Sequence, residues 1–299
     1  MHIVIAGGSG FVGSALQVTL LSRGHTLSIL TRSIQKVGET DKVRAVQWLG
    51  PEDRPEEELK KVDAVINLAG ESINGRWTKA KKQRIIQSRL QAVEELLALI
   101  RKLDEQPKVW INASAVGYYG MSDTETFTEQ DTEPAEDFLA RVAVSWESAA
   151  LKAEKLGLRV VLARLGVVLG QEGALPLMTL PYKLGVGGTI GAGRQWVSWV
   201  HAQDAAGLME YCLREEEIRG AVNVTAPEPA TMEEFGKTIG LVLHRPHWLP
   251  VPRLAMKLFL GEMSQMLLSG QRVLPEKALA AGYEFQYPDL RQALADLLK

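Results

Sequence analysis

Short apolar runs alternate with longer amphipathic stretches through the first 170 residues of the chain. This alternation is typical of βαβ units, in which a parallel sheet is covered by helices on both faces. Six apolar runs predict β-strands, at residues 3–6, 27–31, 45–49, 64–68, 109–113 and 160–165. We therefore predict an α/β fold of the Rossmann type, with a doubly wound parallel sheet.

Between these runs, hydrophobic residues recur three and four positions apart, as on a helix with one buried face. The first such stretch begins after Gly10 and ends at Gly24, because glycine commonly follows the last turn of a helix. A second stretch covers residues 79–103, and a third runs from Leu139 to Gly157. The stripe of helix 79–103 is explained equally by packing on its own sheet and by pairing with a second copy in a homodimer.

The pattern changes beyond Gly170. Residues 170–196 contain seven glycines, two prolines and no long periodic run, which predicts a loop or small lobe on the substrate side of the sheet. Residues 197–225 return to a strand and helix pattern, and the segment from about residue 250 predicts short helices. We therefore predict a dinucleotide-binding domain at residues 1–225 and a small, mostly helical C-terminal lobe at residues 226–299.

Composition narrows the class of protein. The 299 residues include 34 Lys and Arg against 36 Asp and Glu, a net charge of −2 without a basic block, which disfavours nucleic acid and an anionic membrane surface as partners. The single cysteine, Cys212, excludes an internal disulfide and a Cys-rich zinc site, and we predict no metal. Without a signal-peptide pattern or a membrane-length apolar run, the sequence predicts a cytoplasmic protein.

The strongest motif is the turn at residues 7–13, Gly-Gly-Ser-Gly-Phe-Val-Gly, between the first strand and the first helix. Gly7 permits a tight turn, Gly10 lets the backbone approach a pyrophosphate, and Gly13 lets the helix pack closely on the strand. The N-terminus of the helix then offers amide groups to the phosphates. A plain tight turn is the alternative, which the strand and helix on either side disfavour.

The end of the second strand bears on the choice of cofactor. An acidic residue there binds the ribose of NAD, whereas an Arg accommodates the 2′-phosphate of NADP. This chain has Thr31 and Arg32 at that place and no carboxylate before Glu39. We therefore favour NADP(H) over NAD(H), with a solvated surface Arg as the alternative interpretation of Arg32.

Further motifs follow in order along the chain. They are Asn-Leu-Ala-Gly at residues 67–70, Ala-Ser-Ala-Val-Gly-Tyr-Tyr-Gly at 113–120, Arg-Leu-Gly at 164–166 and Trp-Val-His-Ala-Gln-Asp at 199–204. With the glycine turn they resemble the extended short-chain dehydrogenase/reductases of the NAD-dependent epimerase/dehydratase family, over about residues 1–225. The whole chain resembles a bacterial group whose members are named after sugar-nucleotide epimerases or cell-division inhibitors.

The resemblance implies roles at the matched positions. Cofactor contacts are implied in the glycine turn, after the second strand and after the fourth: Gly7, Ser9, Gly10, Phe11, Val12, Gly13, Thr31, Arg32, Leu68, Ala69 and Gly70. Ser114 would be an active-site hydroxyl that bonds a substrate carbonyl or alcohol. A strand-end hydroxyl bonded to backbone is its alternative.

One departure from the family decides what else can be carried over. The family uses a Tyr-x-x-x-Lys pair, in which the Tyr transfers a proton and the Lys lowers the Tyr pKa and binds the nicotinamide ribose. None of the six tyrosines here is followed by Lys four residues later. Aligning Glu147 with the family's Glu after the Lys places Leu139 at the Tyr position and Ala143 at the Lys position. An apolar residue transfers no proton.

Other groups would have to supply an acid or base. Tyr118 and Tyr119 follow Ser114 closely, and Glu71 follows Gly70 directly, so these three join Ser114 as catalytic candidates. Their alternatives are an aromatic packing pair for the two tyrosines and a solvated or helix-start carboxylate for Glu71.

Three functions remain open from the sequence. The first is an NADP(H)-dependent oxidoreductase or epimerase that acts on a small substrate, with nucleotide sugars among the candidates, through a non-standard proton donor. The backbone of residues 187–191 would serve an anionic substrate. The second is a catalytically inactive dinucleotide-binding regulatory protein, with a link to cell division suggested by the resemblance. The third is a scaffold that has also lost the cofactor.

Overall fold

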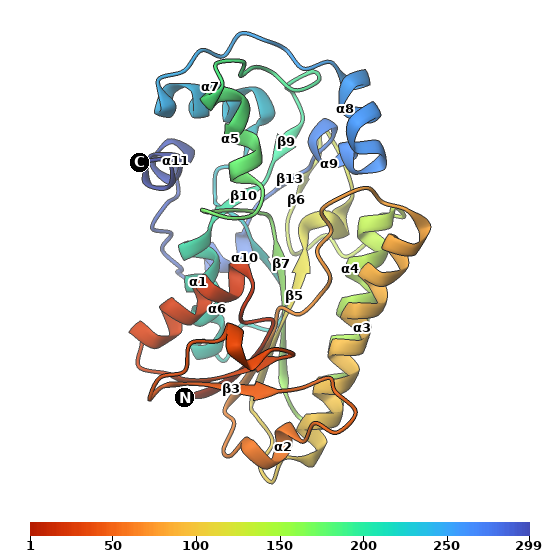
Figure 1. Ribbon diagram of the computed structural model, residues 1–299, viewed down its shortest axis with the longest axis vertical. Coiled ribbons are helices and arrows are strands. Elements are labelled where there is room, and N and C mark those ends of the chain that lie inside the picture. Colours follow the sequence, from red (N-terminus) through yellow and green to blue (C-terminus); the bar gives the residue numbers. More distant parts are fainter.

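The computed structural model describes the backbone of residues 1–299 and every side chain except those of Ala255, Lys257, Phe259 and Leu260. Its centre is a seven-stranded parallel sheet of order β11-β7-β5-β4-β1-β2-β3 (Figure 1). The strands are β1 His2–Ala6, β2 Thr26–Thr31, β3 Val43–Gln47, β4 Ala64–Asn67, β5 Val109–Ala115, β7 Arg159–Leu165 and β11 Gly220–Val224. The predicted Rossmann-type sheet is confirmed, and β11 extends it beyond the six predicted strands.

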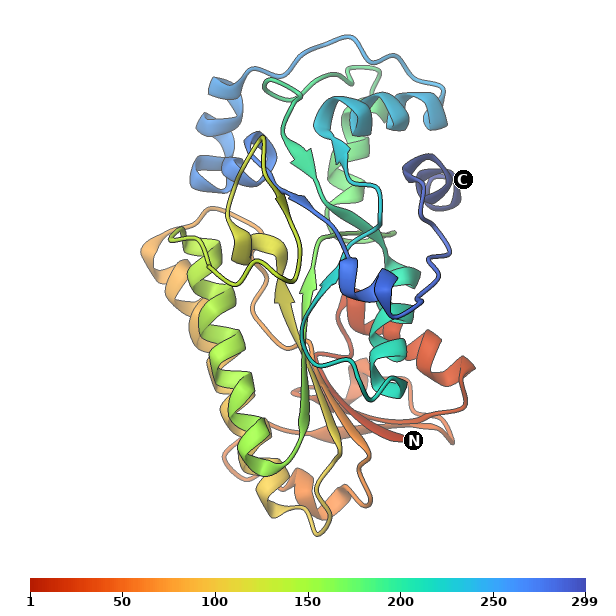
Figure 2. The same ribbon diagram turned by 180° about the vertical axis from the view of Figure 1, so that it is seen from behind.

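Two helical layers cover the sheet. Helices α3 (Lys79–Lys102) and α4 (Phe138–Ala150) lie on one face, and α1 (Phe11–Ser22) and α6 (Ala202–Arg214) lie on the other (Figures 1 and 2). Alternate residues of β1 separate the two cores, since Ile3 packs with α1 and α6 whereas Val4 packs with α3.

The helix ends follow local chemistry. The side chains of Thr78 and Asp137 cap α3 and α4 by accepting from backbone amides. Gly24 and Gly157, with φ of 83° and 84°, stand after the predicted helical stretches, and the last residues before Gly157 form the 3₁₀ helix η3 (Leu151–Leu156). At α1 the N-cap is Gly10, which has no side chain to cap the helix.

The segment predicted as a loop or small lobe at residues 170–196 contains a helix, α5 (Leu175–Lys183), which corrects the loop alternative. Leu175, Thr179 and Tyr182 share its buried face and pack toward α7 (Met232–Leu243). Because this burial comes from a distant part of the chain, the helix forms around Pro181 although the local pattern predicts none.

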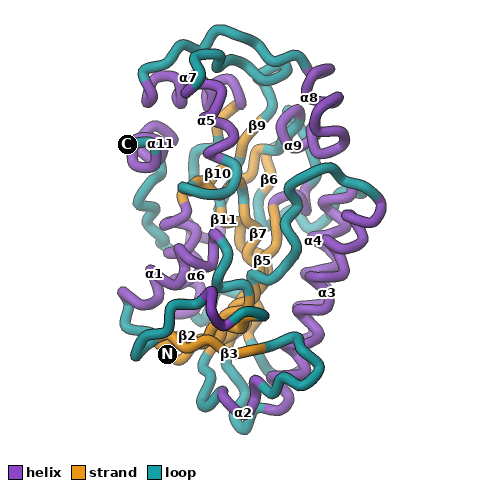
Figure 3. Tube along the Cα trace, viewed as in Figure 1, coloured by secondary structure: helices purple, strands orange, loops and turns teal.

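Helices α5 and α7 and several short strands lie beyond the C-terminal edge of the sheet (Figure 3). Short strands link this region: β8 (Val167–Leu169) pairs with β10 (Trp199–His201), and β9 (Trp196–Val197) pairs with β12 (Ala230–Thr231). The remaining short elements are η1 Ile34–Lys36, α2 Pro55–Glu58, η2 Val116–Tyr119, β6 Thr126–Phe127, α8 Arg253–Leu260, η4 Gly261–Ser264, α9 Gln265–Leu268, β13 Arg272–Val273, α10 Glu276–Ala280 and α11 Leu290–Leu297.

The C-terminal part contacts the sheet domain at several places, of which one is a strand pair and another involves a buried carboxylate. Strand β13 pairs with β6. The buried carboxylate of Asp204 on α6 accepts from the amides of Gln286 (2.7 Å) and Tyr287 (2.9 Å). Asp204 therefore fixes the chain before α11. The division of the chain into two domains at residue 225 remains a prediction. Within the described residues, no helix is both long and apolar enough to span a membrane.

Candidate dinucleotide site

The turn between β1 and α1 is built so tightly that side chains are excluded from it. Gly7 has a φ of 79°, and a Cβ there would lie 2.7 Å from the carbonyl carbon of Leu68. A Cβ on Gly13 would lie 2.4 Å from the carbonyl oxygen of Gly8. The amide of Gly10 donates to the carbonyl of Gly7 at 3.1 Å and closes the turn. The glycines are therefore required by close backbone approach at both ends of the turn.

The same turn leaves the first amides of α1 free. In the described part of the chain, the amides of Phe11, Val12 and Gly13 have no hydrogen-bond acceptor, whereas Ser14 already donates to Gly10 at 2.8 Å. Free amides at a helix N-terminus carry partial positive charge and bind phosphate groups. The cradle and these amides together fit the pyrophosphate of a dinucleotide.

The side chains of the turn have other partners. The ring of Phe11 lies against Gly170 and Gly173, where added Cβ atoms would come within 2.5 Å and 3.2 Å of it. Val12 packs on the sheet core and Ser9 is exposed. Phe11 thus connects the glycine turn to the segment that leads into α5.

At the end of β2, the structure separates Thr31 from Arg32. Thr31 is buried, and its hydroxyl both accepts from the amide of Ser33 and donates to its carbonyl at 3.1 Å. Arg32 is exposed and forms no ion pair with the described side chains. Glu39, the first carboxylate after it, accepts from the amide of Ala45 at 3.1 Å. A cation is therefore available here and the carboxylate is engaged with β3.

Two buried asparagines shape the loop after β4. Asn67 donates to Asn112 on β5 at 2.8 Å and accepts from the amide of Ala69 at 3.1 Å. Leu68 and Ala69 are half-buried and Gly70 is exposed. The resemblance implies that residues 68–70 line the cofactor, and the close approach of Gly7 to Leu68 places that loop against the glycine turn.

Comparison with known proteins agrees with this geometry. Residues 3–225 match the model of the NAD dependent epimerase/dehydratase family. The chain belongs to the NAD-dependent epimerase/dehydratase family. Residues 251–297 match a domain of unknown function, DUF1731. The resemblance drawn from the motifs is thus confirmed.

Relatives of this epimerase-family chain match it from end to end. The epimerase family protein YfhF of Bacillus subtilis (strain 168) is 50% identical, with 100% of this chain and 98% of the relative covered. A solved structure, the human epimerase family protein SDR39U1 (isoform 2) with NADPH, has a TM-score of 0.87 and 34% identity, covering 99% of both chains. The nucleoside-diphosphate sugar epimerase of Corynebacterium glutamicum has a TM-score of 0.79 and 28% identity, covering 100% of this chain and 58% of that one.

Ser114 lies in a buried network and does not face the open end of β5. It is 3% exposed, and its hydroxyl donates to Glu147 of α4 at 2.6 Å. Glu147 is also buried and pairs with Arg164 of β7 through two bonds of 2.9 Å. Ala115, the next residue of β5, is the exposed one. The hydroxyl therefore holds an ion pair between two layers of the fold.

The two tyrosines after β5 surround the same Arg. The guanidinium of Arg164 lies 3.4 Å from the ring centroid of Tyr118 and 4.9 Å from that of Tyr119. The Tyr118 hydroxyl donates to the carbonyl of Thr132 at 2.6 Å, and that of Tyr119 donates to Asn223 at 2.8 Å. Burial raises the pKa of Tyr119 to about 12. In this geometry both hydroxyls are hydrogen-bonded within the protein and both rings pack on Arg164. Tyr119 is therefore a poor base near neutrality.

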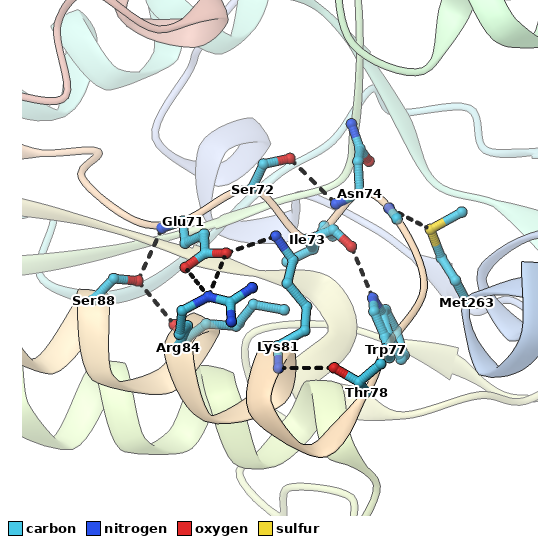
Figure 4. A network of polar contacts seen from close by, with 12 residues as sticks. Glu71, Ser72, Ile73, Asn74, Trp77, Thr78, Lys81, Arg84, Ser88 and Met263 are labelled. Carbon is cyan, nitrogen blue, oxygen red and sulfur yellow. Dashed lines mark hydrogen bonds and ion pairs between the residues drawn. The ribbon is translucent and has the colours of Figure 1, made fainter.

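Glu71 is tied to the start of α3 (Figure 4). Its carboxylate accepts from Lys81 at 2.8 Å and from Nε of Arg84 at 3.2 Å, and its amide donates to Ser88 at 2.9 Å. The hydrogen bond from Lys81, together with Arg84, lowers the pKa of Glu71. A carboxyl that stays ionised holds the loop at residues 70–78 and is a poor proton donor near neutrality.

The structure also shows the surroundings of Leu139 and Ala143, which stand on α4 at the positions of the family's Tyr and Lys. Leu139 packs in an apolar cluster with Trp77 and Ile85, and lies close to Gly117 after β5. Ala143 is buried in a second cluster with both tyrosines. Apolar packing therefore occupies these two positions of α4.

The ion pair between Glu147 and Arg164 was not predicted from the sequence. A signal for each partner was present, since Arg164 interrupts the apolar run 160–165 and Glu147 follows Trp146 on the buried face of α4. Charged residues on two buried faces predict a mutual partner, because burial of either alone is costly.

Proposed function

We propose that the protein binds NADP(H) and transfers a hydride between its nicotinamide and a small carbonyl or alcohol substrate, with nucleotide sugars among the candidates. The carrying observation is the glycine cradle combined with an exposed Arg32 and an engaged Glu39. The NADPH in the human relative's structure supports the same cofactor.

When bound, the cofactor supplies the hydride, and the residues of the chain position it. The free amides of α1 would hold the pyrophosphate, Arg32 would bond the 2′-phosphate, and residues 68–70 would line the cofactor beside β4. Ser114, Tyr118 and Glu71 are engaged with protein partners, as is Tyr119. We therefore propose that water donates the proton when a carbonyl substrate is reduced and accepts it when an alcohol substrate is oxidised.

The first test is a titration of the protein with NADPH and NADH, repeated on Arg32→Ala. A hydrogen bond to a charged group contributes about 1.5–3 kcal/mol, so the variant should bind NADPH about 10- to 100-fold more weakly. NADH, which has no 2′-phosphate, should be affected about twofold or less. Arg101→Ala is the matched control, because Arg101 is an exposed Arg at the far end of α3 and should leave both affinities unchanged.

Equal binding of NADPH and NADH by the native protein would refute the assignment of Arg32. Absence of binding by either cofactor would refute the proposed function as a whole, and would leave the glycine turn as a feature of the fold.

A regulatory dinucleotide-binding protein is the second candidate. The observation that favours it is that all four predicted acid or base groups are bonded within the protein. Oxidation of NADPH with a panel of aldehydes, ketones and nucleotide sugars separates the two. Turnover supports the oxidoreductase, whereas tight NADPH binding without turnover, together with a protein partner captured only when NADPH is present, supports the regulator.

A further inference from the structure

Arg89 is a cation on the buried side of helix α3, next to the loop at residues 68–70 that we propose binds the cofactor. Arg89 falls on the same side of α3 as Ile85, Ala92 and Leu96, which are buried apolar residues. Its Nη1 donates to the carbonyls of Ile85 (2.9 Å) and Glu71 (3.0 Å). Among the described residues, its Nε is buried without an acceptor, and no carboxylate forms an ion pair with it. Burial lowers the pKa of Arg89 to about 10, so it keeps its charge near neutrality.

The guanidinium lies where α3, α4 and the loop after β4 meet. A Cβ on Gly70 would lie 2.9 Å from its central carbon, so the glycine makes room for it. Its central carbon also lies over the ring of Trp146 on α4, 4.8 Å from the ring centroid. Leu68 and Ala69 pack in the same cluster as Trp146. Arg89 thus lies directly behind the loop that we assign to the cofactor.

This position also bears on α4. Trp146 is three residues beyond Ala143, so the Arg89 guanidinium meets α4 about one turn from the register of the missing Lys. Ala143 is buried and apolar and offers no charge there. Arg89 on α3 therefore provides a positive charge about one turn from Ala143, where α4 itself has an apolar residue.

We propose that Arg89 is a cofactor-binding residue whose guanidinium supplies, from α3, the positive charge for the nicotinamide half of NADP(H). The proposal rests on the proposed function. Nη2 has no acceptor among the described residues and is the group left to donate to a ribose hydroxyl or a phosphate oxygen of that half. No carboxylate of the described residues is bonded to this half-buried cation, although the charge of Glu71 acts on it, and the phosphates of a bound dinucleotide would add further compensating negative charge.

The test separates the two halves of the cofactor. Affinities for NADPH and for 2′,5′-ADP, which has no nicotinamide half, are measured on the full-length protein and on Arg89→Met. Loss of one charged hydrogen bond should weaken NADPH binding about tenfold, while 2′,5′-ADP binding stays within about twofold. Arg32→Ala should weaken both ligands, because both carry the 2′-phosphate.

Arg101→Met is the matched control, since Arg101 is an exposed Arg at the far end of the same helix and outside the loop at residues 68–78. It should leave both affinities unchanged. Unaltered NADPH affinity in a folded Arg89→Met protein, or an equal loss for NADPH and 2′,5′-ADP, would overturn the proposal and leave Arg89 as a clamp on the Glu71 carbonyl.

A second variant decides the case if Arg89→Met does not fold. Arg89→Lys keeps the charge but loses the fork that bonds two acceptors. It should again weaken NADPH and spare 2′,5′-ADP, and unchanged affinity for both would count against the proposal. If the native protein binds 2′,5′-ADP and NADPH equally well, the Arg89 proposal fails while the proposed cofactor site stands. If it binds neither, the proposed function fails.

Discussion

Replacing Gly7 with alanine tests whether the glycine turn is set by close contact with the loop after β4. The residue has a left-handed backbone, with a φ of 79°. A Cβ there would lie 2.7 Å from the carbonyl carbon of Leu68 and 2.8 Å from the amide nitrogen of Ala69. Both atoms are backbone, so no side-chain rotation can relieve the overlap.

The expected cost has two parts. A left-handed backbone costs a non-glycine residue about 1–2 kcal/mol. The added Cβ must also push the loop from 2.7 Å to an ordinary contact of 3.4 Å, a displacement of 0.7 Å. Overpacking of this kind costs about 1–3 kcal/mol, so Gly7→Ala should lose about 2–5 kcal/mol of unfolding free energy.

Gly24→Ala provides the matched control. Its φ of 83° carries the same backbone strain, but a Cβ there meets nothing within 4 Å. Only the strain of about 1–2 kcal/mol should be lost. Urea unfolding followed by circular dichroism measures both variants, and a fluorescence titration with NADPH compares their affinities. Gly7→Ala should bind NADPH at least about tenfold more weakly, because a shift of this size in a positioning loop is costly, while Gly24→Ala should bind normally.

Equal stability losses in the two variants would refute the steric part of the argument. Unchanged NADPH affinity in a Gly7→Ala protein that is less stable than Gly24→Ala would separate the loop contact from cofactor binding, and would contradict the assignment of residues 68–70 to the cofactor.

Three further predictions concern groups outside the turn. Glu147→Gln leaves the Arg164 guanidinium buried without its carboxylate, and urea unfolding should show a loss of about 3–5 kcal/mol of unfolding free energy. A double variant, Glu147→Leu with Arg164→Met, should lose less because no buried charge remains unpaired. Glu71→Gln should lower the melting temperature at pH 7, and this difference from the native protein should shrink as the pH falls below about 4.3. The folded-state pKa of Glu71 is depressed, so its contribution is present above the unfolded-state pKa of about 4.3 and is lost as the pH falls through the folded-state value. Cys212 is buried and its pKa is raised to about 12 by burial, so a thiol reagent should modify it only after unfolding in urea, and rapid modification of the native protein would contradict this placement.

The catalytic candidates illustrate how far a one-dimensional pattern reaches. Ser114 was selected from the resemblance to the family, and Glu71 because it directly follows Gly70. Neighbouring residues in a strand point to opposite faces of the sheet. Ser114 points toward α4 and Ala115 toward the open side, and Glu71 is taken up by cations on the helix that follows. Partners that are distant in sequence decided which polar groups are free.

Local patterning determined the sheet, its main helices and the glycine turn, because each depends on residues close together in the chain. Apolar period, strand propensity and the glycines of residues 7–13 act over one element and its neighbours. Only the tertiary structure decided the helix α5 and the environment of Arg89. Both depend on burial against segments far away in the sequence, namely α7 for the helix, and Gly70 and Trp146 for the guanidinium. The free energy of such burial is set by which faces meet, and no window of neighbouring residues contains that information.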